Sequence, residues 1–297
     1  MSTLYTHQSE NVRKTWFLMT GFLVVLVAVG WALSYVYGNW NILIGFAVLS
    51  VVMNIIAYWQ SDKIALSSAR AIPADEVQYL ELHRIVENLA ITAGLPKPRV
   101  FIMNDPSPNA FATGRDPQHA AIAVTTGLLG MMNRSELEGV IAHELSHVGN
   151  RDILVATVVV VLVGLLSMVA DFFMRSMIWG GGRRNNNDRE NGNGLLMILG
   201  VIAIILAPIV ATLIQLAISR KREFLADASG ALLTRYPEGL ASALQKIAAY
   251  DQPMQHASTA TAHLFIANPF GVGKKSLANL FATHPPIEER VAKLLNQ

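Results

Sequence analysis

The chain alternates between long uncharged stretches and segments in which apolar residues recur among polar ones. Three of the stretches contain no charged residue, and a fourth contains only Asp171, close to its end. They cover residues 16–37, 40–59, 153–173 and 195–219. A helix of about 20 apolar residues, rising about 1.5 Å per residue, is long enough to cross the hydrocarbon core of a bilayer. The pattern therefore predicts four membrane spans arranged in two hairpins, 16–59 and 153–219.

Positive charges near the ends of these spans predict their orientation, because Lys and Arg concentrate on the cytoplasmic side. With four spans, the tail 1–15 and the segments 60–152 and 220–297 all lie on one side. That side holds eight basic residues near the spans: Arg13, Lys14, Lys63, Arg70, Arg151, Arg220, Lys221 and Arg222. The other side holds four, in and before the Gly- and Asn-rich run 180–194. We therefore expect a multi-pass protein with both termini and the soluble segments in the cytoplasm.

The two large soluble segments flank the second hairpin on the same side, so we expect them to form one α+β domain. Apolar spacing predicts helices over 76–93, 220–234, 238–250 and 286–296, and strands over 99–103 and 121–125. A further helix is expected to begin near Ser135, where Ser135 and Glu138 have the spacing of a capping box.

Composition narrows the chemistry. Hydrophobic residues make up 52% of the chain and charged residues 15%, against roughly 25% charged in a soluble domain. There is no cysteine, which excludes disulfides, Cys-based zinc fingers, iron–sulfur clusters and thiol nucleophiles. A formal net charge of +2 gives no reason to expect a nucleic-acid partner.

The motif H-E-L-S-H at 143–147 carries the candidate chemistry. His143 and His147 are four residues apart, so on a helix they share one face and can bind one metal ion. Glu144 lies beside them, where it can take a proton from a metal-bound water. With no cysteine in the chain, the remaining ligands must be His, Asp or Glu. The motif therefore predicts a zinc site.

A catalytic zinc site needs a third protein ligand. The metzincin spacing would place a glycine and a histidine where this chain has Asn150 and Ile153, so that class is excluded. Glu223 is the best candidate, because an antiparallel membrane hairpin brings its two ends together; Asp227, one turn later, could hydrogen-bond a ligating imidazole. In the alternative interpretation, Glu223 and Asp227 form a solvated face paired with the preceding basic residues. Replacing Arg222, on a different helix face from Glu223, is expected to matter little for zinc binding.

Four motifs occur in a fixed order along the chain. They are N-A-F-A-T-G at 109–114, H-E-L-S-H at 143–147, E-F-L-A-D at 223–227 and T-H-P-P-I-E-E-R at 283–290. Together they resemble the HtpX family of membrane zinc metallopeptidases, whose relatives include the CAAX prenyl proteases. The resemblance extends over essentially the whole chain. It implies a polytopic α-helical membrane protein with a cytoplasmic α+β zincin-like (gluzincin) protease domain.

The resemblance also implies roles at a metal centre. One zinc ion per chain would be held by His143, His147 and Glu223, and Glu144 would be the catalytic base. Asp227 would support the ligands from behind.

Other roles implied by the resemblance lie around that centre. His284 and Arg290 correspond to a late His and Arg of the family, with His284 expected to stabilise the oxyanion. The segment that would receive the extended peptide comprises Asn109, Ala110, Phe111 and Ala112.

The resulting expectation is a zinc endopeptidase of the bacterial inner membrane that degrades misfolded or damaged membrane proteins, in a stress-linked role. Its expected partners are such polypeptides, the lipid bilayer, and other quality-control proteases or adaptors. A CAAX-type prenyl protease remains an alternative, although that branch has more spans. A transporter would carry ionisable residues along a pathway, and a non-catalytic membrane scaffold would be expected to lack Glu144 or a ligand.

Overall fold

The computed structural model describes residues 4–180, 219–258, 260–271 and 285–296, with side chains left out for residues 4–7 and 169–180. The predicted fourth span up to residue 218, the Gly- and Asn-rich run after Gly180, and His284 lie outside these described residues.

Two long apolar helices open the chain. Helix α1 (Leu4–Tyr37) and helix α2 (Trp40–Trp59) contain the predicted spans 16–37 and 40–59. Gly38, at φ +63°, closes the turn between them, and the Asn39 side chain caps α2. Both helices are long and apolar enough to cross a membrane. Many large apolar side chains of both helices are exposed, among them Phe17, Ile44 and Ile55, as expected for a surface that faces lipid.

Aromatic residues lie toward both ends of this helix pair. Trp16 stacks on Tyr58 with ring centroids 6.0 Å apart, and Tyr58 lies at the end of α2 away from the Gly38 turn. Exposed aromatic residues mark the opposite end: Trp31, Tyr35, Tyr37 and Trp40. Tryptophan and tyrosine favour the two membrane–water interfaces, so the positions of these rings are those of a helical hairpin that spans a bilayer.

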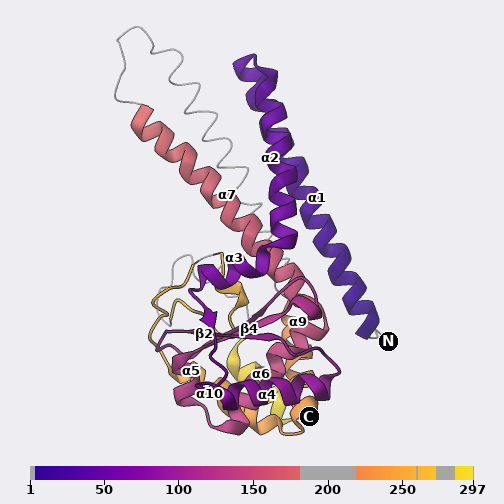
Figure 1. Cartoon of the computed structure of the whole chain (residues 1–297), viewed down its shortest axis with the longest axis vertical. Coiled ribbons are helices and arrows are strands. Elements are labelled where there is room, and N and C mark those ends of the chain that lie inside the picture. Colours follow the sequence, from indigo (N-terminus) through magenta and orange to yellow (C-terminus); the bar gives the residue numbers. More distant parts are fainter. Residues whose placement is uncertain (1–3, 181–218, 259, 272–284, 297) are drawn as a thin grey trace.

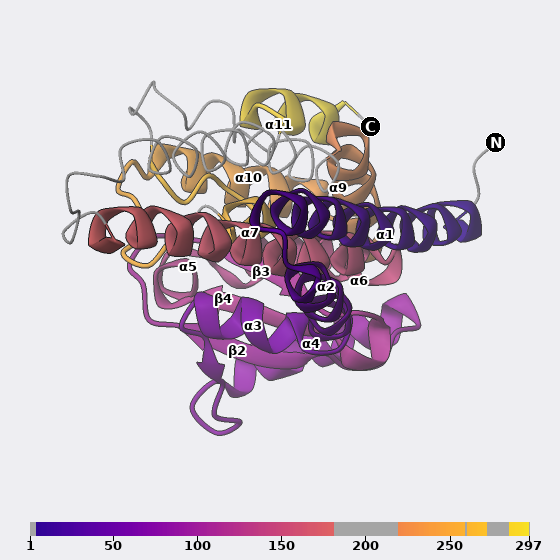
Figure 2. The ribbon, with the colours of Figure 1, turned by 90° about the horizontal axis from the view of Figure 1, so that it is seen from above.

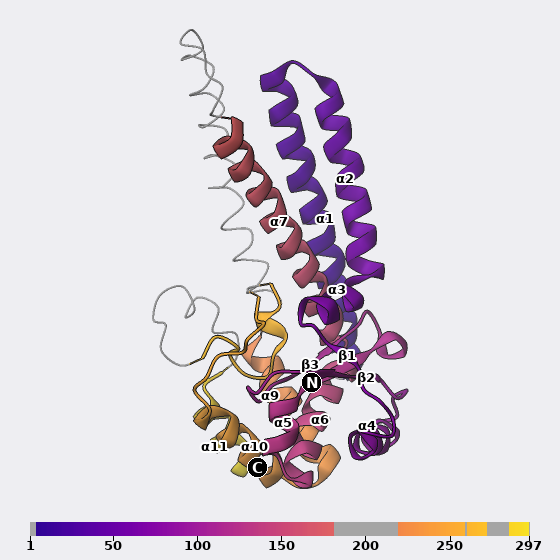
Figure 3. The ribbon, with the colours of Figure 1, turned by 60° about the vertical axis from the view of Figure 1, so that its left-hand side comes forward.

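A third long helix follows a sharp bend. Helix α6 (Arg134–Gly149) and helix α7 (Asp152–Gly180) meet at an angle of 83°. Among the described residues, Arg134–Gly149 and Asp152–Met168 reach the length and hydropathy of a span only as a pair. The described residues therefore hold two candidate spans, in α1 and α2, or three if this bent pair counts as one span. Helices α1, α2 and α7 extend in the same direction from the remaining helices and strands, which we call the α/β region (Figures 1 and 3).

The α/β region contains one four-stranded sheet in the order β1-β2-β4-β3. Its strands are β1 (Ile72–Pro73), β2 (Arg99–Met103), β3 (Ala110–Thr113) and β4 (Ala121–Thr125). Strands β2 and β4 are parallel and coincide with the two predicted strands, and β1 and β3 run antiparallel to their neighbours. The sequence pattern does not reveal β3, because it is a short strand with two alanines, whereas the equally buried β4 carries Ile122 and Val124.

Helices cover both faces of this sheet: α3 (Ser61–Ser68) lies over one face, as the view from above shows (Figure 2), and α4 (Leu80–Ala93) and α6 pack on the other. Further helices of this region are α5 (Thr126–Met131), α9 (Arg220–Thr234), α10 (Pro237–Ala249) and α11 (Ile287–Leu295), with short 3₁₀ turns at Pro117–His119 and Ala262–Leu264. Helix α4 begins later than predicted, because Asp75 accepts hydrogen bonds from Val77 and Gln78 and holds a turn there.

The start of α6 differs from the prediction. The N-cap is Asn133, whose side chain accepts from the Glu136 amide while the Glu136 carboxylate accepts from the Asn133 amide, at 3.0 and 2.9 Å. The predicted pair Ser135 and Glu138 does not form the capping box. Glu136 is also bound by Ser242 and Lys246 of α10, and these contacts favour the earlier cap.

Close packing of α9 on α6 brings the candidate site together. Gly230 of α9 lies against the backbone of α6, where a Cβ atom would be 3.0 Å from the backbone nitrogen of His143. Only a residue without a side chain permits this approach without displacing a helix. The contact therefore sets how near Glu223, two turns earlier on α9, lies to the histidines of α6.

Candidate metal centre

Helix α6 places the two histidines of H-E-L-S-H one turn apart on the same face. Their Nε2 atoms lie 3.3 Å apart, and their rings are nearly perpendicular. His143 is 1% exposed, whereas His147 is partly open to the cavity described below. Both imidazoles therefore direct one nitrogen at a common point.

Helix α9 brings Glu223 to the same point. One of its carboxylate oxygens lies 3.8 Å from Nε2 of His143 and the other 3.5 Å from Nε2 of His147. The ligand atoms of a tetrahedral zinc ion, bound at about 2.0–2.1 Å, lie about 3.3 Å apart. The three side chains thus have the separation and donor chemistry that fit one zinc ion, and they could hold a metal.

Asp227 and Arg290 support His143 from behind. The Nδ1 atom of His143 lies 2.9 Å from Asp227 Oδ1, and Arg290 donates to both Asp227 oxygens at 2.8 and 2.7 Å. Burial raises the pKa of Asp227, but the hydrogen bonds from Arg290 and His143 outweigh it and lower that pKa to about 2. Because an ionised carboxylate only accepts hydrogen bonds, Nδ1 carries the proton and Nε2 keeps its lone pair for a metal.

Asp152 supports His147 in the same way. Its Oδ2 atom lies 3.0 Å from His147 Nδ1, while its Oδ1 atom accepts from Asn11 at 2.7 Å and from Arg222 at 3.2 Å. Arg222 is thus linked to the site through Asp152, while its expected small effect on zinc binding stays a prediction. It sits in the first turn of α9, from which its long side chain reaches Asp152 at the start of α7.

The charge around His147 favours a cation. Burial lowers the pKa of His147, but its hydrogen bond to Asp152 and the negative charges of Glu223, Asp152 and Glu144 raise it to about 9. Two imidazole lone pairs and a carboxylate converge here. A bound cation, either a proton or a metal, would relieve their mutual repulsion.

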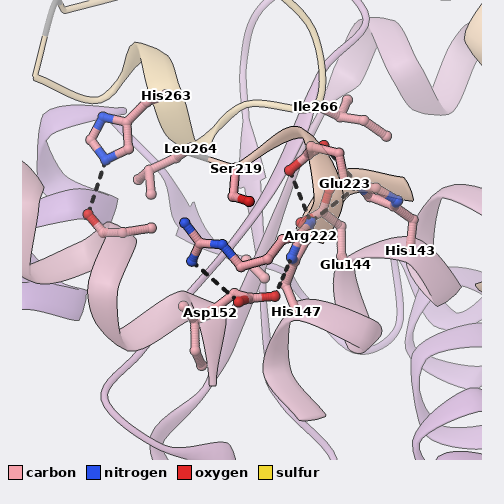
Figure 4. A pocket seen from close by; sticks show the side chains of 13 residues that line it. His143, Glu144, His147, Asp152, Ser219, Arg222, Glu223, His263, Leu264 and Ile266 are labelled. Carbon is pink, nitrogen blue, oxygen red and sulfur yellow. Dashed lines mark hydrogen bonds and ion pairs between the residues drawn. The ribbon is translucent and has the colours of Figure 1, made fainter. Parts of the chain in front are cut away.

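A small cavity of about 40 Å³ opens beside these ligands (Figure 4). Its lining includes His143, Glu144, His147 and Glu223, together with Asp152 and Arg222 from behind and a segment at 263–266. Such a volume is large enough to hold water. Glu144, 2% exposed, therefore borders the space where a water would meet the metal ligands.

The low exposure of the two acidic residues on α9 decides between the two interpretations of their role. Glu223 is 7% exposed and Asp227 is 2% exposed, so they do not form a solvated face.

The predicted peptide-binding segment lies on and next to β3. Ala112 lines the cavity, whereas Phe111 is fully buried against Phe265. The side chain of Asn109 is also buried and bonds in both directions with the backbone of Ala267. Contact between these residues and a substrate remains a prediction. His284 lies outside the described residues, so its position beside the site is also still a prediction.

Known proteins with a similar sequence are named as proteases. Residues 76–297 match Peptidase family M48. A "Protease HtpX homolog" of Caldanaerobacter subterraneus is 56% identical over 98% of this chain and 97% of its own length, and one of Thermoanaerobacter pseudethanolicus is 54% identical over the same shares. One of Pyrococcus furiosus is 49% identical over 95% of this chain and 94% of its own.

Among solved structures, the crystal structure of S. mikatae Ste24p aligns with a TM-score of 0.49 and 17% identity, over 98% of this chain and 66% of that one. The family match covers most of this chain, and the HtpX homologues match it almost from end to end. The chain therefore belongs to peptidase family M48, among the membrane metalloproteases of the HtpX type.

Proposed function

We propose that this chain is a membrane-bound zinc endopeptidase and that His143, His147 and Glu223 hold its metal. The observation that carries this proposal is the convergence of the three side chains, with Asp227 and Asp152 fixing the imidazoles from behind. Bound zinc would supply Lewis-acid polarisation of the scissile carbonyl and lower the pKa of a coordinated water.

Glu144 is the proposed general base. It lines the cavity next to the ligands, where it can accept a proton from the attacking water and return it to the leaving amine. His284 is proposed to donate to the oxyanion that develops on the carbonyl oxygen. Arg290 is proposed to act through Asp227 rather than on the substrate, because its guanidinium is fully buried against that carboxylate.

The peptide is proposed to bind as an extended strand at the β3 edge of the sheet, as in zincin-like folds. Strand β3 ends the sheet order, and Ala112 faces the cavity. The amide of Ile266 already donates to the carbonyl of Ala110 at 3.0 Å. The segment around Ile266 therefore occupies part of the β3 edge, next to the cavity that Ala112 also lines.

The substrates are proposed to be damaged or misfolded membrane proteins, degraded in a stress-linked quality-control role in the bacterial inner membrane. The support is the location of the site: Asp152 begins α7, and Asn11 lies just before the apolar part of α1. A site at the base of membrane helices is close to polypeptide that emerges from a bilayer. Other proteases or adaptors are proposed partners for delivering it.

We propose that segments 60–152 and 220–297 form this protease domain in the cytoplasm, with hairpins at 16–59 and 153–219. Accessibility labelling tests this orientation in intact cells. A cysteine introduced at Ser68 should be protected from a membrane-impermeant thiol reagent, and one in the 185–194 run should react. Equal protection of both would contradict a second hairpin that crosses the membrane.

Digestion of an unfolded protein by the purified chain tests the proposed enzyme. Activity should require zinc and disappear with a chelator. Glu144→Gln should keep zinc but lose proteolysis, because the amide preserves shape and cannot take a proton. Near-normal cleavage by Glu144→Gln would contradict the assigned base, and a zinc-loaded wild type that cleaves no peptide would favour a scaffold.

A further inference from the structure

The break between α6 and α7 is what lets Asp152 reach His147. In one continuous helix, residues five positions apart point about 140° away from each other. Here the chain turns by 83° at Asn150 and Arg151, and Arg151 takes a left-handed conformation with φ +57°. The turn brings the Asp152 carboxylate within 3.0 Å of His147 Nδ1. The orientation of this candidate metal ligand therefore depends on the geometry of the break.

The first membrane helix holds that break in place. The side-chain amide of Asn11 on α1 donates to the carbonyl of Asn150 at 3.0 Å and to Asp152 Oδ1 at 2.7 Å. Both of its amide hydrogens are thus used, one on each side of Arg151. Gln8, one turn earlier, donates to the carbonyl of Gly149 at 2.7 Å. Figure 1 shows the N-terminal end of α1 lying beside the α/β region.

Because the Asn11–Asp152 contact is buried, its loss would be hard to compensate. Asn11 is 3% exposed and Asp152 is 6% exposed, so water has little access to replace a lost donor. Arg222 also reaches Asp152 Oδ1, at 3.2 Å, but Asn11 is closer and is the donor that joins the carboxylate to the backbone of the break.

We propose that Asn11 is a positioning residue for the metal centre: by docking α1 on the α6–α7 break it orients Asp152, and Asp152 orients His147. Membrane helix α1 is thereby part of the zinc site rather than only an anchor. This inference rests on the proposed metal centre. It adds a residue outside the four motifs of the sequence, 141 positions from Asp152.

The test uses the full-length protein in detergent and measures zinc affinity by competition with a chromophoric chelator. The visible spectrum of the Co²⁺-substituted protein serves as a second readout of ligand geometry. Asp152→Ala should weaken zinc by roughly 10–100-fold, as is typical for loss of the group that orients a ligand. Asn11→Leu should weaken it by about tenfold and alter the Co²⁺ spectrum, since it removes one of the donors to that group.

Gln8→Leu is the matched control, because Gln8 lies on the same helix and contacts the same break but does not bond Asp152. It should leave zinc affinity within about twofold of wild type, since the groups around the ligands stay in place. In the Asp152→Ala background, Asn11→Leu should cause no further loss, because both changes interrupt one connection.

Wild-type zinc affinity in Asn11→Leu would overturn the inference, and so would equal losses in Gln8→Leu or additive losses in the double variant. If Asn11→Leu does not fold, Asn11→Ser gives the same test with a polar side chain too short to reach both acceptors. Failure of the proposed metal centre is distinguishable: there His143→Ala would itself retain wild-type zinc affinity.

Discussion

His143 and His147 meet the same point in space, but the groups behind them come from different parts of the molecule. Behind His143 stand Asp227 and Arg290, from α9 and α11 of the α/β region. Behind His147 stands Asp152, at the start of the long apolar helix α7, held in part by Asn11 of α1. Half of the candidate metal centre is therefore fixed within the α/β region, and the other half is fixed by the long helices α1 and α7.

The two halves also differ in how deeply the side chains behind each histidine are buried and in how they are hydrogen-bonded. Arg290 is fully buried and pairs with Asp227 through two hydrogen bonds, which gives a rigid, charge-neutral support. Asp152 has three donors, and the side chain of one of them, Arg222, is 12% exposed. We expect the His143 side to govern stability. Changes in how the membrane helices dock should reach the metal centre through the His147 side.

Breaking the buried pair should have the largest effect. Arg290→Met leaves the Asp227 carboxylate buried without its cation, which should lower the free energy of unfolding by about 3–5 kcal/mol. The matched change on the other side, Arg222→Met, should cost only about 1–2 kcal/mol, because Asp152 keeps two other donors. Thermal unfolding of the metal-free variants in detergent measures both. Equal losses would remove the difference between the two halves.

The pH dependence of zinc binding should come next. Zinc needs a neutral imidazole, and the pKa of His147 in the metal-free site is about 9. Zinc affinity should therefore rise with pH, by about tenfold per unit below that value, and level off above it. Chelator competition from pH 6.5 to 10 measures this, and in Asp152→Asn the rise should end at a lower pH. Constant affinity between pH 7 and 9 would contradict the charge balance assigned to the His147 side.

The same pKa has a consequence for the metal-free protein. Because the folded state raises the pKa of His147 from 6.5 to about 9, the protonated imidazole stabilises the fold. That contribution should be fully present below pH 6.5 and lost as the pH rises through about 9. Zinc-loaded protein should not show this loss, since the metal replaces the proton.

The smallest effect should come from spacing alone. Gly230→Ala adds a Cβ atom 3.0 Å from the His143 nitrogen, so α9 must move by a few tenths of an ångström. Glu223 would move with it, and zinc affinity should fall by roughly three- to tenfold, less than the loss expected from removing a supporting carboxylate. Gly164→Ala, where an added Cβ meets nothing within 4 Å, is the control. An unchanged affinity in Gly230→Ala would show that the α6–α9 distance does not limit the site.

Local patterns in the sequence were enough for much of this arrangement. Charge-free runs locate α1 and α2, and the H-E-L-S-H spacing places two imidazoles on one helix face. Glu223 required one further step, namely that a hairpin returns to where it began. Each of these inferences uses either a helical period or a length, which are properties that a sequence displays directly.

Asp152 and Asn11 could not be found in this way. Their contact depends on the 83° break after Gly149, and no periodic pattern reports the direction of a bend. Helical spacing also does not reveal the contact of Arg222 with Asp152, because that contact joins the first turn of α9 to the start of α7. Similarly, β3 is short and contains two alanines, so its residues give only a weak strand signal, and its pairing with β4 identifies it. What the sequence did not reveal are contacts between elements distant along the chain.

Anomalous diffraction at the zinc absorption edge locates the metal and so tests the proposed set of three ligands. We predict one zinc per chain, about 2.0–2.2 Å from Nε2 of His143, Nε2 of His147 and a carboxylate oxygen of Glu223, with a position left open for water. A zinc peak away from these three side chains, or a fourth protein ligand closing the site, would contradict it.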